Sequence, residues 1–231
     1  MAKNERVYPD IGDIQTEFSF FYENAFYLTS DPRRLAKLLV HYELFKRAMD
    51  MPGDIVECGV FKGTSFSRFV KFRNIFESSR SKRVIGFDIF GKFPPDETLK
   101  EDVVFRKRFI DEAGEKSISR RALMKFLEKS NAAENILLIK GDVSKTIPDF
   151  LNSDPGLRIS LINIDVDLYK PTRDCLHYLY GRVSPGGVLI LDDYHGFPGA
   201  TKAIDEFFSD KPHIKIEKYP WTSSPYYVVK R

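Results

Sequence analysis

The chain contains 231 residues, 42% of them hydrophobic, and carries a formal net charge of +3. This length predicts one large domain, or one domain with an added lid. Because the net charge is small and Lys and Arg are interleaved with Asp and Glu, we expect no nucleic-acid partner. No apolar run is long enough for a transmembrane helix and no cleavable signal opens the chain, which predicts a cytoplasmic protein without a membrane partner.

The first 50 residues precede the strand pattern and form one predicted segment, residues 1–50. This segment contains an aromatic cluster between Phe18 and Tyr27, followed by a predicted helix near residues 33–49. It can pack against the main domain or a second subunit, or it can form a lid over a binding site. The two alternatives are compatible.

Residues 51–231 alternate between strand and helix patterns. Apolar, β-branched runs predict buried strands, and apolar residues at helical spacing predict the helices between them. This alternation predicts an α/β fold with a doubly wound, mostly parallel sheet. The expected strands are residues 55–58, 84–88, 136–139, 159–164, 188–191 and an antiparallel 226–229; the expected helices are 65–76, 147–151, 174–183 and 200–208.

One stretch, at about residues 96–130, is too long for a single crossover between strands. It contains two charged amphipathic candidates, residues 99–110 and 119–128. Because the insertion directly follows a strand end, we expect it to supply a helical lid over the ligand edge of the sheet, or to pack against the sheet or another subunit.

Two of the expected strands end in carboxylates. Asp165 and Asp167 follow the fourth strand, and Asp192 and Asp193 follow the fifth. Ligands bind at this edge of open α/β sheets, and carboxylates gathered there repel one another unless a cation joins them. The pattern therefore predicts a divalent-metal site. His195 is a candidate base or ligand, or an ordinary loop histidine.

The turn after the first expected strand contains two glycines, which allow a ligand to approach the backbone closely. The third glycine of a dinucleotide fingerprint is missing. After the second strand, Asp88 can accept hydrogen bonds from a ribose; after the third, Asp142 can bind the amino group of an adenine or cap a helix. Together these features predict an adenosine pocket. Its predicted cofactor-binding residues are Glu57, Gly59, Gly63, Thr64, Ser65, Asp88 and Asp142.

These motifs resemble those of the macrocin O-methyltransferase family, in the segments DIVECGVFKGTS (54–65), GFDIF (86–90), KGDV (140–143), NIDVDLY (163–169) and GGVLILDDY (186–194). The likeness extends from about residue 38 to residue 208. It implies a class I, Rossmann-like fold that uses S-adenosylmethionine and Mg²⁺ to methylate a sugar hydroxyl. The acceptor would be a small glycoside, such as an antibiotic, or a glycan precursor, and members form homodimers or higher homo-oligomers with helical lids.

The resemblance also implies roles for the acidic residues. The metal ligands would be Asp165, Asp192 and Asp193, and the base would be Asp167, favoured over its rival His195. A sugar hydroxyl is a poor nucleophile at neutral pH, so a metal and a nearby carboxylate suit the reaction.

Three alternatives remain open at this stage. Asp165-Val166-Asp167 fits the D-x-D motif of a metal-dependent glycosyltransferase, although the glycine turn and Asp88 would then have no role. A nicotinamide oxidoreductase is disfavoured by the missing glycine. A non-catalytic nucleotide-binding module is disfavoured by the intact acidic clusters.

Overall fold

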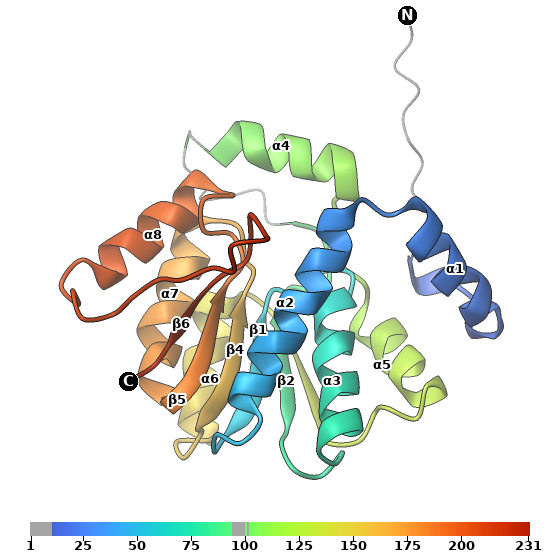
Figure 1. Ribbon diagram of the computed structural model, residues 1–231, viewed down its shortest axis with the longest axis horizontal. Helices are drawn as coiled ribbons and strands as arrows, with labels where there is room; N and C mark the ends of the chain where they lie inside the picture. Colours follow the sequence, from blue (N-terminus) through green and yellow to red (C-terminus); the bar gives the residue numbers. More distant parts are fainter. Residues whose placement is uncertain (1–10, 94–99, 101) are drawn as a thin grey trace, which may run out of the picture.

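The computed structural model describes residues 11–93, 100 and 102–231. Its centre is a six-stranded sheet with the strand order β3-β2-β1-β4-β5-β6 (Figure 1). Strands β1 to β5 are parallel and β6 pairs antiparallel with β5, which confirms the predicted doubly wound, mostly parallel sheet. The strands are β1 (Asp54–Cys58), β2 (Val84–Asp88), β3 (Ile136–Lys140), β4 (Ile159–Ile164), β5 (Val183–Leu191) and β6 (Tyr226–Val229).

Helices of the described chain cover both faces of this sheet (Figure 1). On one face, Leu44, Phe66 and Leu127 from three helices belong to one buried core. On the other face, Ile147 and Leu176 belong to a second core. The first group is α2 (Pro32–Ala48), α3 (Thr64–Phe76) and α5 (Arg120–Lys129); the second is α6 (Val143–Ser153), α7 (Tyr169–Leu179) and α8 (Pro198–Phe208).

The order of the strands positions the binding edge. Every residue of β2 and β4 is buried, as expected for parallel strands covered on both faces. The chain runs from β1 outward to β2 and β3, and then returns to the other side of β1 with β4. Such a reversal opens a crevice beyond the carboxyl ends of the two central strands, β1 and β4.

The region around β5 differs from the sequence-based expectation. The helix predicted at residues 174–183 is α7 followed by a short 3₁₀ helix, η3 (Tyr180–Arg182), and β5 begins at Val183 rather than near residue 188. The first half of β5 contains Pro185, Gly186 and Gly187, which are untypical of strands. It is accommodated by a register shift in the pairing of β4 with β5.

The predicted insertion separates into two different helices. The second, α5, packs into a core of the sheet through Leu123 and Leu127, so it is a structural helix. The first, α4 (Asp102–Ala113), lies across the top of the sheet in Figure 1, beyond the strand ends. Residues 96–99 and 101 of the predicted insertion lie outside the described residues.

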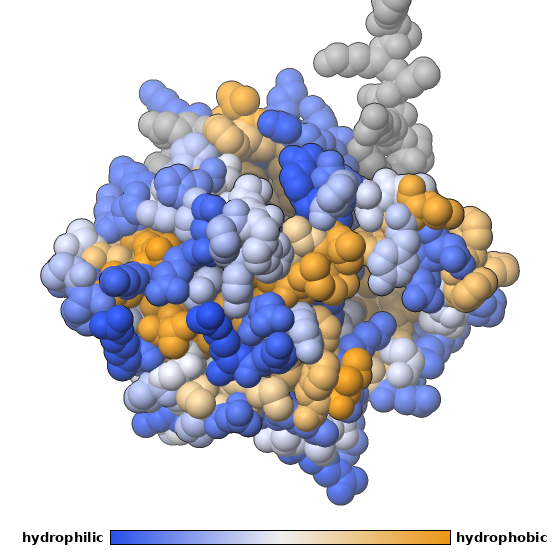
Figure 2. All heavy atoms as spheres, viewed as in Figure 1, coloured by the Kyte–Doolittle hydropathy of each residue, from blue (hydrophilic) through white to orange (hydrophobic). Residues whose placement is uncertain are grey.

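The N-terminal segment also contains elements of two kinds. Helix α2 packs on the sheet and belongs to the α/β domain, whereas α1 (Ser19–Thr29), preceded by the 3₁₀ helices η1 (Ile11–Asp13) and η2 (Thr16–Phe18), buries none of its residues. Phe20 and Leu28 of α1 are 77% and 85% exposed. Figure 2 shows hydrophobic atoms gathered at this end of the molecule. Residues 1–10 of the predicted segment lie outside the described residues.

Within the described residues, no helix combines the length and the apolar composition that spanning a membrane requires.

Candidate active site

A cavity of about 1080 Å³ lies at the carboxyl ends of the strands. Its wall is formed by the turn after β1, by the residues that follow β2, β3, β4 and β5, and by parts of α1, α2, α3, α4 and α7. The predicted site residues that line it are Gly59, Thr64, Ser65, Asp88, Asp142, Asp165, Asp167, Asp192 and Asp193. The structure thus brings nine of the predicted residues together around one space.

Three predicted site residues lie elsewhere in the described chain. Glu57 and Gly63 are buried beside the cavity and do not line it. His195 is exposed and borders a separate, shallow surface depression together with Phe105 of α4. Its ring packs against those of Tyr194 and Tyr226, at centroid distances of 4.4 and 5.2 Å. His195 therefore lies outside the cavity that Asp167 lines.

The turn after β1 requires glycine because its backbone lies in close contact with the backbone that follows β4. Gly59 has a φ of +90°, and a Cβ atom built there would lie 1.7 Å from the carbonyl oxygen of Asp165. Gly63, with a φ of +81°, is the N-cap of α3. Both conformations favour glycine. The turn therefore presents its backbone, and the first residues of α3, directly to the cavity.

Asp88 organises this turn. Its Oδ2 accepts hydrogen bonds from the backbone N–H groups of Val60 and Phe61, at 3.0 and 2.9 Å. The carboxylate also borders the cavity. Asp142 is the N-cap of α6, where its side chain accepts from the N–H of Ser144 at 2.9 Å. Both residues thus have structural roles in addition to the ligand contacts predicted for them.

Glu57 forms a buried polar pair with Asn163. The side chain of Glu57 is fully buried, and its Oε1 accepts a hydrogen bond of 2.9 Å from Asn163 Nδ2. Burial raises the pKa of this carboxyl to about 7. The pair joins β1 to β4 immediately below the cavity. Its role as a cofactor contact stays a prediction.

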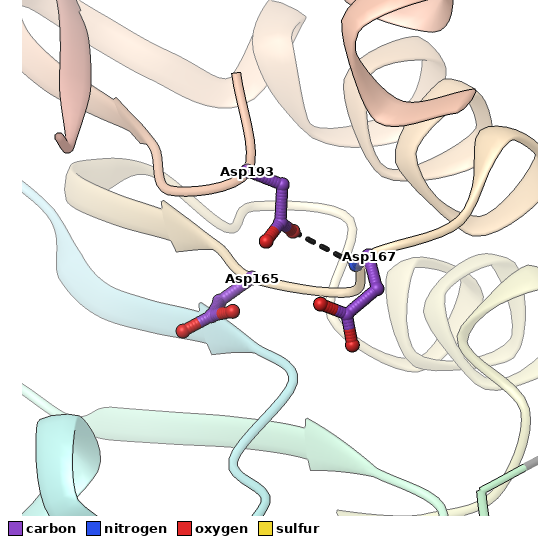
Figure 3. Close-up of side chains that lie close together, drawn as sticks. All are labelled: Asp165, Asp167 and Asp193. Carbon is purple, nitrogen blue, oxygen red and sulfur yellow. Dashed lines mark hydrogen bonds between the residues drawn. The ribbon is translucent and has the colours of Figure 1, made fainter. Parts of the chain in front are cut away.

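Three carboxylates converge on one point beyond β4 and β5 (Figure 3). One oxygen from each of Asp165, Asp167 and Asp193 lies within 4.8 Å of the others. Asp193 Oδ2 also accepts a 2.8 Å hydrogen bond from the backbone N–H of Asp167. An extended chain would point Asp165 and Asp167 in opposite directions. Asp167 instead has a φ of +61°, so the backbone turns and the two side chains share one site.

The charges of these three carboxylates are poorly compensated. Burial raises the pKa of Asp165 well above its ordinary value, and the neighbouring Asp192 raises it further. Burial, followed by repulsion from Asp165, does the same for Asp167, and burial with repulsion from Asp167 does so for Asp193. A cation placed among them would remove this repulsion.

The fourth carboxylate, Asp192, is held by helix α2. Its Oδ2 accepts a 2.7 Å hydrogen bond from Lys37 Nζ, which also lies 3.7 Å from Asp165 Oδ2. Burial acts to raise the pKa of Asp192, but the charge of Lys37 and its hydrogen bond act in the opposite direction, and the pKa falls below its ordinary value. The other oxygen, Asp192 Oδ1, is buried and has no hydrogen-bond partner within the described chain.

Helix α4 closes one side of the cavity with aromatic rings. Phe109 lies 5.1 Å from Phe61 in the glycine turn and 6.3 Å from Phe197 before α8, measured between ring centroids. At the start of α4, the buried Asp102 Oδ1 accepts a 2.8 Å hydrogen bond from the N–H of Gly199. These contacts attach α4 to both the glycine turn and α8.

Comparison with known proteins identifies the family. The family model described as macrocin-O-methyltransferase (TylF) matches residues 27–219. The chain belongs to the macrocin O-methyltransferase family. This match extends beyond the motifs at both ends and includes α2, β1 to β5 and α8.

Characterised relatives share 30% or less of their residues with this member of the family. One is the 8-demethyl-8-(2,3-dimethoxy-alpha-L-rhamnosyl)-tetracenomycin-C 4'-O-methyltransferase of Streptomyces olivaceus, 30% identical over 145 residues, which are 62% of this chain and 54% of the relative. Another is the mycinamicin III 3''-O-methyltransferase of Micromonospora griseorubida, 28% identical over 163 residues, 68% and 61% of the two chains. The matches thus span little more than half of these relatives.

Solved structures show the same fold. The calicheamicin methyltransferase CalS11 superposes with a TM-score of 0.73 at 24% identity, covering 94% of this chain and 86% of CalS11. The O-methyltransferase NovP gives a TM-score of 0.67 at 22% identity, covering 84% and 79%. The chain therefore has the class I methyltransferase fold that the sequence predicted.

Sequence reasoning missed the basic residues of α2 and α3 that border the cavity. Lys37 contacts Asp192 across 155 positions of sequence, and Arg34 and Arg68 also line the cavity. On a helix of ordinary composition such residues resemble surface charges. The only available signal was their position on helices that flank the first βα turn.

Proposed function

We propose that the protein transfers a methyl group from S-adenosylmethionine to a sugar hydroxyl of a glycosylated natural product or glycan precursor, and that Mg²⁺ is required. The observation that carries the proposal is the single cavity that joins the Gly59 turn and Asp88 to the acidic cluster. Family membership supports methyl transfer. The relatives named above are O-methyltransferases of tetracenomycin and mycinamicin compounds, which supports a glycoside acceptor.

The adenosine part of the cofactor would occupy the β2 and β3 side of the cavity. Asp88 is placed to accept from the ribose hydroxyls, and Asp142 is placed to accept from the adenine amino group. The N-terminus of α3, with Thr64 and Ser65, lies on the opposite side of the turn and offers backbone donors. The reactive methyl group would then face the acids beyond β4 and β5.

The acidic side chains fit a divalent cation. Asp165 and Asp193 belong to the compact cluster, and Asp192 offers the buried oxygen Oδ1, which has no partner in the described chain. An all-carboxylate donor set suits Mg²⁺, which prefers oxygen ligands. A bound Mg²⁺ would supply Lewis acidity that lowers the pKa of a sugar hydroxyl. The family resemblance assigns Asp165, Asp192 and Asp193 to the metal, and we propose this set, although the compact cluster in the structure consists of Asp165, Asp167 and Asp193.

Asp167 is then available as the base. Its carboxyl lies within the same cluster, and burial raises its pKa, which makes it a stronger proton acceptor than an exposed aspartate. The backbone N–H of Asp167, bound to Asp193, fixes the position of the residue. The aromatic rings of Phe61, Phe109 and Phe197 would exclude water from the acceptor.

The experiment that tests this function combines binding and turnover. Melting temperatures measured with S-adenosylmethionine, a nucleotide-sugar or NAD, each with and without Mg²⁺, identify the cofactor class. A panel of glycosides is then assayed for methyl transfer from labelled S-adenosylmethionine. Of the three ligands, we expect only S-adenosylmethionine to raise the melting temperature. We also expect EDTA to abolish methyl transfer.

A pair of matched variants makes the metal arm specific. Asp193→Asn should retain the shift with S-adenosylmethionine but lose Mg²⁺-dependent transfer, whereas Asp149→Asn, an exposed aspartate on α6, should behave as wild type. Full transfer in excess EDTA would refute the metal requirement. A shift with a nucleotide-sugar and none with S-adenosylmethionine would instead favour a glycosyltransferase, because Asp165 and Asp167 do share one site.

Homo-oligomerisation is part of the proposal. The exposed apolar residues of α1 support it, since contiguous apolar surface of this kind is commonly covered by a partner. Sedimentation of the full chain, compared with a Phe20→Asp variant, tests whether α1 mediates association.

A further inference from the structure

Two arginines of the cavity wall have no role in the function proposed above. Arg34 lies on α2 and Arg68 on α3, and both line the cavity. Within the described part of the chain, neither guanidinium forms a hydrogen bond or an ion pair. The nearby acids are engaged elsewhere: Asp31 pairs with Arg33 at 2.9 Å, and Asp192 pairs with Lys37 at 2.7 Å.

The two guanidinium groups also repel each other. Burial lowers the pKa of Arg68, and the positive charge of Arg34 lowers it further. An anion placed between them would relieve this repulsion. A guanidinium fork matches a carboxylate in geometry and can bind it through two parallel hydrogen bonds. The arrangement is therefore suited to an anionic group that enters the cavity.

The position of the pair within the cavity selects the ligand. If the cofactor is S-adenosylmethionine, its adenosine lies toward Asp88 and Asp142 and its methyl group faces the acids beyond β4. The methionine tail, the remaining substituent of the sulfonium, must then extend past the end of β1 toward the start of α3. Arg68 lies one helical turn after Thr64, on the same face of α3, and Arg34 faces the cavity from α2.

We propose that Arg68 and Arg34 bind the α-carboxylate of the methionine portion of S-adenosylmethionine. This assignment rests on the proposed function. It gives the pair a task distinct from that of Lys37, which is held by Asp192 and Asp165. Arg68, which is half-buried, contributes more than Arg34, which is exposed, because water screens the charge of an exposed group.

The test compares two ligands that differ in the methionine tail. S-adenosylhomocysteine carries the α-carboxylate, whereas 5'-methylthioadenosine has the same adenosine and thioether without the amino-acid group. Calorimetry on the full-length protein measures both affinities. We expect Arg68→Ala to weaken S-adenosylhomocysteine binding by about 10- to 100-fold, the loss typical of a charge-assisted hydrogen bond, and to leave 5'-methylthioadenosine binding unchanged.

Further variants complete the design. Arg34→Ala should show the same selectivity with a smaller loss. Lys71→Ala removes an exposed charge of α3 that does not line the cavity, so this control should bind both ligands as wild type does. Arg68→Lys should recover part of the affinity for S-adenosylhomocysteine, because it restores the charge without the fork.

Three results would overturn the assignment. Unchanged S-adenosylhomocysteine affinity in both Arg68→Ala and Arg34→Ala would exclude the carboxylate contact. If the same two variants then raised only the KM for the acceptor, the arginines would bind an anionic group on the acceptor instead. Equal weakening of both ligands would show a general distortion of the pocket. A wild-type protein that binds neither ligand would refute the proposed function, and this inference with it.

Discussion

The buried Glu57 makes the stability of the protein depend on pH in a direction that can be worked out. Its pKa is raised by burial from 4.5 to about 7, whereas in the unfolded chain it returns to its ordinary value. Between these two values the folded protein holds a proton that the unfolded chain has released. Stability therefore falls as pH rises through this window and levels off above the folded pKa. The full loss corresponds to roughly 3 kcal/mol.

Substitution of Glu57 by Gln should remove this dependence. The amide has nearly the same volume, still accepts from Asn163 Nδ2, and can donate to Asn163 Oδ1, a buried atom without a partner in the described chain. At about pH 5 the variant and wild type should have similar free energies of unfolding. At about pH 8 we expect Glu57→Gln to be the more stable protein, by up to about 3 kcal/mol, which is several degrees in Tm.

Urea unfolding of both proteins at a series of pH values measures the effect. Glu128→Gln, an exposed glutamate on α5, is the matched control and should follow the wild-type profile. Parallel profiles for Glu57→Gln and wild type would mean that another group titrates. A Glu57→Gln protein less stable than wild type at about pH 8 would refute the reasoning directly, because it would mean that the ionised carboxylate stabilises the fold.

Three further predictions concern the site. Asp88→Ala should weaken S-adenosylhomocysteine binding by about tenfold or more in calorimetry, since both the ribose acceptor and the support of the turn are lost; unchanged affinity would exclude the ribose role. Asp167→Asn should keep cofactor and Mg²⁺ binding but lose about 100-fold or more in kcat, while the exposed His195→Ala loses little; the reverse order would transfer the role of base to the histidine. Amide hydrogen exchange in α4 should slow when cofactor and acceptor bind together, and exchange that ignores both ligands would make α4 a purely structural helix.

Much of the fold was predictable because parallel strands buried on both faces have recognisable apolar sequences. The runs at residues 84–88 and 159–164 are mostly apolar and fully buried, since helices cover both faces, and their observed bounds match the prediction. The start of β5 was not predictable in this way. In its first half only Val183 is a buried apolar residue, and the pairing with β4 shifts register after it.

The candidate site was predictable in composition but not in detail. Acids at strand ends converge because parallel strands end at one edge, so the cluster could be expected. The left-handed backbone of Asp167, which turns its side chain toward Asp165 and Asp193, has no signature in a single sequence, because aspartate adopts this conformation only occasionally. The ion pair of Lys37 with Asp192 depends on how α2 packs on the sheet, which no local pattern reports.

The contact at Gly59 limits how this protein can change during evolution. The turn after β1 touches the backbone of Asp165 with no room for a side chain, and the N–H of Asp165 donates to the carbonyl of Cys58 at 2.9 Å. Because this contact joins two main-chain segments, substitutions of side chains elsewhere cannot readily change its distance. The spacing between the cofactor turn and the acids is thus inherited as a unit. If the proposed function holds, a different acceptor would have to be accommodated by parts of the wall outside this contact, such as α1 and α4.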